Sequence, residues 1–179
     1  MSYKSKLSPH SYQSSLLKLI DFLDEVVTKI FSLLTVLSLA ALCGVVLLQV
    51  FARTFLENTP PWTEELSRYF FIYTVAFGVG IAFKKGELVS VDIILSKLKE
   101  KHRVSFMLII NIAQSFFIIT IIPYALQYMK IGGWQTSPVL AIPMNTIFFA
   151  SVLILSNLLF FITLDIIRRL YILYNWKDS

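Results

Sequence analysis

Two carboxylates and two arginines lie close together where the first two apolar runs of this chain meet. Glu64, Glu65 and Arg68 open the second run, directly after Trp62 and two prolines, and Arg53 ends the first run. Charge at the mouth of a membrane helix is costly, so it is usually paired, covered by protein or functional. Three roles fit these residues: an ion network that pins the first two spans together, contact with a second membrane subunit, or a solute site.

The rest of the sequence offers little chemistry for an enzyme. Cys43 is the only cysteine, and the two histidines, His10 and His102, lie outside the apolar runs. A thiol oxidoreductase would need cysteine pairs, and a four-helix haem anchor would need histidines inside its bundle. The sequence also contains neither a phosphate-binding glycine loop nor a metal-spaced cluster. We therefore predict a non-enzyme with no metal or cofactor.

Four apolar runs determine the fold class. The chain has 179 residues, 56% of them hydrophobic, and a mean hydropathy of +0.72. Three runs of 21 to 26 residues carry no charge, and a fourth of 18 residues carries only Arg68. A membrane helix needs about 20 such residues to cross a hydrocarbon core about 30 Å thick. The sequence predicts an all-α membrane protein. We expect one membrane domain over 1–179, with spans at about 28–52, 63–83, 104–129 and 143–167.

Two shorter stretches, at about 15–26 and 89–100, place apolar residues at helical spacing with polar residues opposite. This pattern predicts amphipathic helices at the membrane interface, and the first could instead continue into the first span. Pro60 and Pro61 favour the start of a helix after them. We expect Thr63 to be the N-cap of that helix, with Glu64 and Glu65 in its first turn, where the helix dipole favours negative charge.

The net charge of +5 is distributed as a membrane topology signal. Thirteen basic residues lie before the first span, between the second and third, and after the fourth, whereas only Arg53, Arg68 and Lys130 lie on the other side. The positive-inside rule then places both termini and the middle loop in the cytoplasm. The basic groups indicate contact with membrane lipids and not with nucleic acid. The interfacial anchors that we expect are Trp134, Lys84, Lys85, Arg168 and Arg169.

The membrane runs contain few groups that could bind a solute. The cores of the first, third and fourth spans hold no ionisable residue, whereas a solute carrier usually shows buried charge or broken helices. Four amides could line a path, but such amides more often join helices by hydrogen bonds. They are Asn111, Gln114, Gln127 and Asn157. Gly78 and Gly80 are expected to allow close helix packing. This chain is therefore poorly equipped to carry a solute alone.

The run from Trp62 to Tyr69, placed after a first span that ends in an arginine, is the most specific of several motifs shared with one family. Weaker shared pieces are Gln49–Arg53, Phe77–Gly78, Lys85–Glu87, Val91–Asp92 and Ile142–Met144. Through these residues the sequence resembles, from about Leu33 to Arg169, the small DctQ-type membrane subunit of tripartite ATP-independent periplasmic (TRAP) transporters. It departs from the family in having Leu88 after Glu87, where a histidine is frequent.

The resemblance implies a four-helix subunit of the bacterial inner membrane with both termini cytoplasmic. Its partners would be a large permease subunit, which holds the solute and sodium sites, and a periplasmic substrate-binding protein. The solute would be an organic acid such as a C4-dicarboxylate or a sialic acid. The large subunit would move as an elevator, and this chain would broaden its fixed scaffold. The alternatives are a stand-alone homo-oligomeric transporter and, less favoured, a membrane anchor for a redox enzyme.

Overall fold

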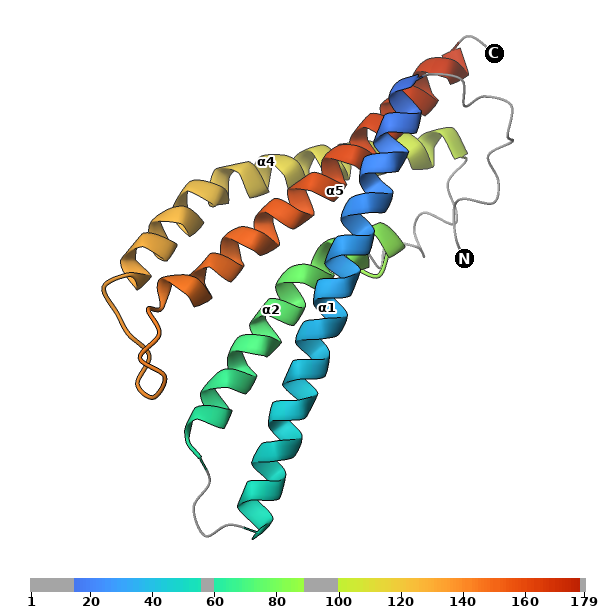
Figure 1. The fold of residues 1–179 in the computed structure, drawn as a ribbon. Helices are drawn as coiled ribbons and strands as arrows, with labels where there is room; N and C mark the ends of the chain where they lie inside the picture. The colour runs from blue at the N-terminus through green and yellow to red at the C-terminus, as the bar shows by residue number, and fades with distance from the viewer. Residues whose placement is uncertain (1–14, 56–59, 89–99, 178–179) are drawn as a thin grey trace.

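The computed structural model describes residues 15–55, 60–88 and 100–177, and four long helices make up most of them (Figure 1). The helices are α1 (Ser15–Phe55), α2 (Trp62–Lys85), α4 (Glu100–Gly132) and α5 (Asn145–Lys177). Each is long and apolar enough to cross a membrane. The prediction of an all-α membrane protein with four spans is confirmed. The helices extend beyond most of the predicted span boundaries.

Helix α1 is continuous over 41 residues, so the stretch 15–26 is not a separate interfacial helix. Of the two possibilities that the sequence left open, continuation into the first span is the one observed. No proline lies within α1, and its first glycine is Gly44, so nothing in the sequence interrupts the helix at the membrane boundary. The second predicted interfacial helix, 89–100, lies outside the described residues except for Glu100, which begins α4.

Both ends of α2 follow local rules, with one correction to the expected start. Pro61 is the N-cap and its side chain makes no capping hydrogen bond. Thr63 is not the N-cap, because it lies in the first turn and its Oγ1 donates to the Pro60 carbonyl at 2.8 Å. Glu64 and Glu65 occupy the first turn, as predicted. At the other end Gly86 adopts φ 76°, a left-handed conformation that glycine accommodates without strain.

The four helices form an open row and not a closed bundle. Helix α1 packs on α2, α2 packs on α5, and α5 packs on α4, while α1 meets α5 over a short stretch only. Figure 1 shows the α1–α2 and α4–α5 hairpins meeting near the free ends of α1 and α5 and diverging toward their connecting loops. In this order α1 and α4 lie at the two edges of the row, so each has one broad face that the other described helices do not cover.

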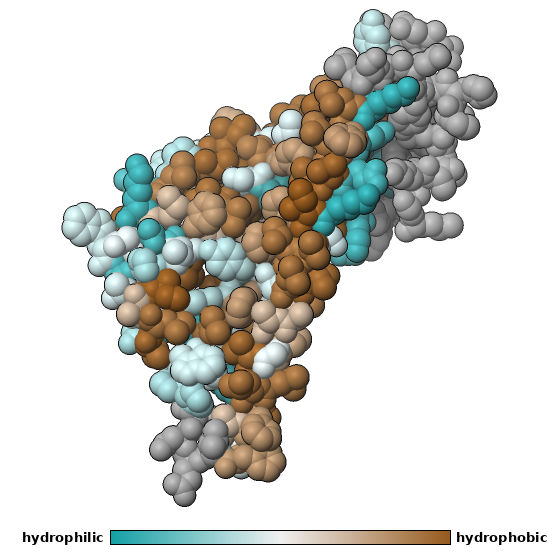
Figure 2. Space-filling view, viewed as in Figure 1, coloured by the Kyte–Doolittle hydropathy of each residue, from teal (hydrophilic) through white to brown (hydrophobic). Residues whose placement is uncertain are grey.

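The small buried core lies along the central helices. Ala76 of α2 and Ala150, Phe161 and Ile162 of α5 are among the most buried residues. In the most apolar 18 residues of α1, by contrast, no residue is buried. Figure 2 shows apolar side chains over much of the visible surface, with hydrophilic ones gathered toward its two ends. Such a surface is expected for helices whose outer faces contact lipid or another membrane protein.

Candidate functional site: polar contacts between the helices

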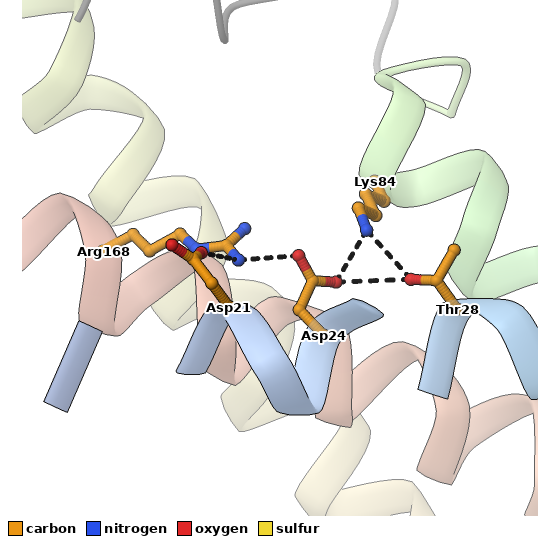
Figure 3. A network of polar contacts seen from close by, with 5 residues as sticks. All are labelled: Asp21, Asp24, Thr28, Lys84 and Arg168. Carbon is orange, nitrogen blue, oxygen red and sulfur yellow. Dashed lines mark hydrogen bonds and ion pairs between the residues drawn. The ribbon is translucent and has the colours of Figure 1, made fainter. Parts of the chain in front are cut away.

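Asp24 is the centre of a polar cluster that joins three helices near the start of α1 (Figure 3). Its Oδ1 lies 2.8 Å from Lys84 Nζ of α2, and its Oδ2 accepts from an Arg168 nitrogen of α5 at 2.6 Å. The same Arg168 nitrogen lies 2.8 Å from Asp21 Oδ1, and Lys84 also donates to Thr28 Oγ1 at 2.9 Å. We call Asp21, Asp24, Thr28, Lys84 and Arg168 the Asp24 cluster.

The Asp24 cluster follows from the amphipathic pattern at the start of α1. Asp21, Asp24 and Thr28 recur at spacings of three and four and therefore share one helix face. The Asp24 side chain is only 8% exposed, whereas those of Lys84 and Arg168 are 33% and 30% exposed. A carboxylate buried to that degree needs paired charges, and two cations from different helices supply them. The cluster therefore fixes α1, α2 and α5 relative to one another.

Three of the four basic residues expected as interfacial anchors pair with carboxylates of this chain. Lys84 and Arg168 belong to the Asp24 cluster, and Arg169 Nε lies 2.6 Å from Asp165 Oδ2, which also accepts from Asn111 of α4 at 2.6 Å. Lys85 is exposed. Contact of these cations with lipid headgroups stays a prediction, but the structure gives Lys84, Arg168 and Arg169 a second role in connecting or supporting helices.

In the middle of the row, the Asn157 side chain of α5 forms hydrogen bonds with the backbone of α2. Its Nδ2 donates to the carbonyls of Ala76 and Phe77 at 3.0 and 3.1 Å. Gly80 makes this approach possible, because a Cβ there would lie 2.2 Å from Asn157 Oδ1 and 2.5 Å from the Phe161 ring. The expected roles of Asn111 and Asn157 in joining helices are thus confirmed, as is that of Gly80 in close packing.

The N-terminal half of α2, away from the Asp24 cluster, forms hydrogen bonds with the loop that connects α4 to α5 and with the start of α5. Glu65 Oε2 accepts from the Leu140 backbone N–H at 2.9 Å, and Glu65 Oε1 accepts from Tyr69 at 2.7 Å. The Tyr73 hydroxyl donates to the carbonyl of Thr146, in the first turn of α5. These contacts give Glu65 an intrachain partner in the second connecting loop and not in the first span.

The other members of the predicted charged cluster do not form the four-residue network that was one of the possibilities. Glu64 and Arg68 lie 3.5 Å apart as a pair within α2, with side chains 72% and 67% exposed. Arg53, near the end of α1, and Trp62, at the start of α2, are also exposed. Glu65 therefore contacts the second connecting loop, whereas Arg53, Trp62, Glu64 and Arg68 have exposed side chains.

Trp134, the expected anchor on the connecting-loop side, is 92% exposed. It follows the end of α4, in a loop where Ser137 N–H donates to the Ile142 carbonyl and Met144 N–H donates to the Gln135 carbonyl. Such exposure is compatible with a place at the headgroup level, where tryptophan side chains collect. Its contact with lipid stays a prediction.

The residues that the structure describes show no group of histidine, cysteine, aspartate or glutamate able to hold a metal ion. Two grooves between described helices are apolar. One of about 390 Å³ runs between α4 and α5 past Tyr124, Tyr128 and Leu155. The other, of about 240 Å³, lies between α1 and α5 past Phe31 and Phe160. Neither groove is lined by a cation that could bind an organic acid.

Sequence reasoning missed Asp24 and Asp165, the two carboxylates that organise most of these contacts. A usable signal was present for each. Asp165 precedes Arg169 by four residues on one helix, a spacing that favours an ion pair. Asp24 lies with Asp21 on the polar face of an amphipathic stretch, and a polar face that continues a membrane helix can face protein as well as solvent.

Comparison with known proteins assigns the chain to a family. The family model of the DctQ component of tripartite ATP-independent periplasmic transporters matches residues 42–171. The chain belongs to the DctQ family. It is therefore a TRAP small permease subunit, a multi-pass protein of the bacterial inner membrane and a transporter component, not an enzyme. This confirms the family expected from the motif beginning at Trp62.

Individual relatives agree with the family match. The chain is 27% identical over 152 residues to a putative TRAP transporter small permease protein of Haemophilus influenzae, covering 85% of this chain and 90% of that protein. It is 33% identical over 108 residues to the sialic acid TRAP transporter small permease protein SiaQ of Vibrio cholerae, covering 60% and 62%. It is also 30% identical over 63 residues to the sialic acid TRAP transporter permease protein SiaT of H. influenzae, covering 35% and 10%.

Proposed function

We propose that this DctQ subunit is the fixed, non-catalytic scaffold beside a large elevator-type permease in a sodium-driven importer of organic acids. The observation that carries the proposal is the use of the polar side chains within its helices. Asp24, Asn157 and Asp165 are engaged in contacts with neighbouring helices, and the grooves are apolar. Interhelical contacts of this kind suit a rigid support better than a path for a charged solute.

The large permease is the partner with the most direct support. The matched segment of SiaT makes up 10% of that permease, so a segment similar to this chain occurs within a much longer transporter protein. This supports direct association between a DctQ subunit and a large permease. We further propose that the large subunit holds the solute and sodium sites and that a periplasmic binding protein delivers the solute. Two of the similar proteins, SiaQ and SiaT, belong to sialic acid transporters, which favours a sialic acid over a C4-dicarboxylate.

Reconstitution tests this division of labour. Tagged chain is purified in mild detergent with whatever large polytopic protein accompanies it, and placed in liposomes with the periplasmic binding protein and an inward sodium gradient. We expect uptake of labelled sialic acid by the complex and none by the small chain alone. Solute movement by the chain alone would favour a stand-alone transporter. Uptake of succinate in place of sialic acid would correct only the solute class.

The orientation of the chain is part of the same proposal. The distribution of basic residues supports cytoplasmic termini. Fusion of a green fluorescent protein after Ser179 should therefore fluoresce, whereas alkaline phosphatase at the same place should stay inactive. Active phosphatase would reverse the orientation.

The exposed residues Arg53, Trp62, Glu64 and Arg68 are proposed to contact the large subunit. Their exposure supports this role, and the inward-facing Glu65 would act by holding the connecting loop. We expect Arg68→Ala to reduce recovery of the complex or its uptake without changing solute preference. Unchanged recovery and uptake in this variant would remove the cluster from the interface.

A further inference from the structure

The Asp24 cluster presents charges of both signs at its surface. The side chain of Asp21 is 51% exposed, and those of Lys84 and Arg168 are about a third exposed, while Asp24 is buried beneath them. The two carboxylates balance the two cations, so the cluster as a whole is electrically neutral. A ligand that matches its exposed groups must therefore itself carry a negative and a positive charge.

Both cations keep donors for a further oxygen atom. Arg168 uses Nη2 for its contacts with Asp21 and Asp24, and Lys84 Nζ, which has three donors, contacts Asp24 and Thr28. Within the part of the chain that the structure describes, Arg168 Nη1 makes no hydrogen bond. Figure 3 shows the two cations meeting the two oxygens of the Asp24 carboxylate. They are thus close enough for one phosphate group to accept from both, and phosphate is a preferred ligand of arginine and lysine.

An apolar groove begins next to this cluster, in the wedge where α1 and α5 diverge from their short contact (Figure 1). Its volume is about 240 Å³, and it is lined by Val27, Phe31, Leu153, Ser156, Asn157 and Phe160. Val27 follows Asp24 by three residues, about 4.5 Å along the helix axis, so the groove wall and the cluster occupy adjacent turns of α1. The groove therefore offers an apolar channel that leads away from a charged end.

We infer that the Asp24 cluster and this groove together bind one zwitterionic phospholipid of the phosphatidylethanolamine type. The phosphate accepts from Lys84 and Arg168, the ammonium group donates to Asp21, and one acyl chain lies in the groove. A basic surface alone would select anionic lipids, but here the two aspartates cancel the cations, and an anionic headgroup would bring a like charge to Asp21.

The site is defined by contacts between helices of this chain, so it does not depend on how deeply or at what tilt the helices lie in the bilayer. It requires neither the large subunit nor a solute, and it is therefore independent of the proposed function. A bound acyl chain would fill the wedge that the side chains of α1 and α5 leave open, and so would brace these two helices where they diverge.

Native mass spectrometry of the delipidated full-length chain in mild detergent tests the headgroup assignment. The probes are phosphatidylethanolamine and phosphatidylglycerol with identical acyl chains. We expect one bound phosphatidylethanolamine, with an affinity about fivefold above that for phosphatidylglycerol. Asp21→Asn should abolish this preference, because it removes the acceptor for the ammonium group while Arg168 keeps Asp24. Glu87→Gln is the matched control, since it makes the same charge change at an exposed carboxylate outside the cluster.

A second variant tests the groove. Ser156 lines the groove and is exposed, so Ser156→Trp places a large side chain where the acyl chain would lie. We expect binding of both lipids to weaken about tenfold, which corresponds to the lost burial of about two methylene groups. Thr120→Trp adds the same side chain at an exposed position of α4 and should leave binding unchanged. Circular dichroism of both tryptophan variants checks that their helices are retained.

Several results would overturn the inference. Tighter binding of phosphatidylglycerol by the unsubstituted chain would indicate an ordinary basic surface. A preference that survives Asp21→Asn would remove Asp21 from the site, and equal lipid binding by the two tryptophan variants would remove the groove. Absence of bound lipid above the detergent background would exclude the site altogether. The uptake assay for the proposed function is separate from all four measurements, so either proposal can fail while the other stands.

Discussion

Replacing Asp24 by asparagine tests whether the Asp24 cluster holds the helices together. Asparagine has nearly the same shape but removes the charge that pairs with Lys84 and Arg168. Breaking a buried ion pair by removing one partner costs about 3–5 kcal/mol. Both cations here keep about a third of their surface exposed, and Arg168 retains Asp21, so the penalty is discounted. We expect a loss of about 2–3 kcal/mol, which lowers the folded-to-unfolded ratio about 30- to 140-fold.

The free energy of unfolding is measured by titrating purified chain in mild detergent with sodium dodecyl sulfate, followed by circular dichroism. Glu64→Gln is the matched control, because it removes a carboxylate from an exposed pair within one helix. Such pairs contribute under about 0.5 kcal/mol. A double variant, Asp24→Asn with Arg168→Gln, should cost less than the sum of its single variants, with a coupling of about 1–2 kcal/mol.

Equal stability of Asp24→Asn and Glu64→Gln would contradict the role of the Asp24 cluster in holding the helices together. Additive losses in the double variant would also contradict it, because they would mean that Asp24 and Arg168 do not stabilise the fold through each other.

Two further predictions concern the middle and the loop end of the row. Gly80→Ala should lower the free energy of unfolding by about 1–3 kcal/mol, because the added Cβ overlaps Asn157. Gly44→Ala is the control and should cause no loss, because a Cβ there would lie in open space. The same unfolding titration compares the two variants. Glu65→Gln should speed hydrogen exchange at the Leu140 amide, because the carboxylate oxygen that accepts from it is lost or weakened. Equal midpoints for the two glycine variants, or unchanged exchange at Leu140, would contradict these assignments.

The helices and their local ends could be read from the sequence because short-range rules govern them. Pro60 and Pro61 before α2, and Gly86 after it, act within one or two turns. The capping role of Thr63 could not be decided this way. Its hydroxyl could accept from a helix amide or donate to the Pro60 carbonyl. The choice depends on where the helix begins, and the N-cap is Pro61, two residues before the expected Thr63.

The contacts of the candidate site could be predicted only in part, because they join residues far apart in the chain. Glu65 accepts a hydrogen bond from Leu140, 75 residues later, and Asp24 accepts one from Arg168, 144 residues later. Spacing along one helix shows which residues share a face but not which helix that face meets. The four charged residues near the first connecting loop could therefore be recognised as unusual, while Glu65 could not be assigned to the second loop.

The sequence by itself determined the four membrane helices and the family of this protein. Long apolar runs have few alternatives in a bilayer, because every backbone polar group must be satisfied within the helix. Only the tertiary structure decided the order of helices in the row and the partners of Asp24, Glu65 and Asn157. Helix packing in a membrane depends on close approach at small residues such as Gly80 and on a few polar contacts. Those are properties of two surfaces together, and neither helix specifies them alone.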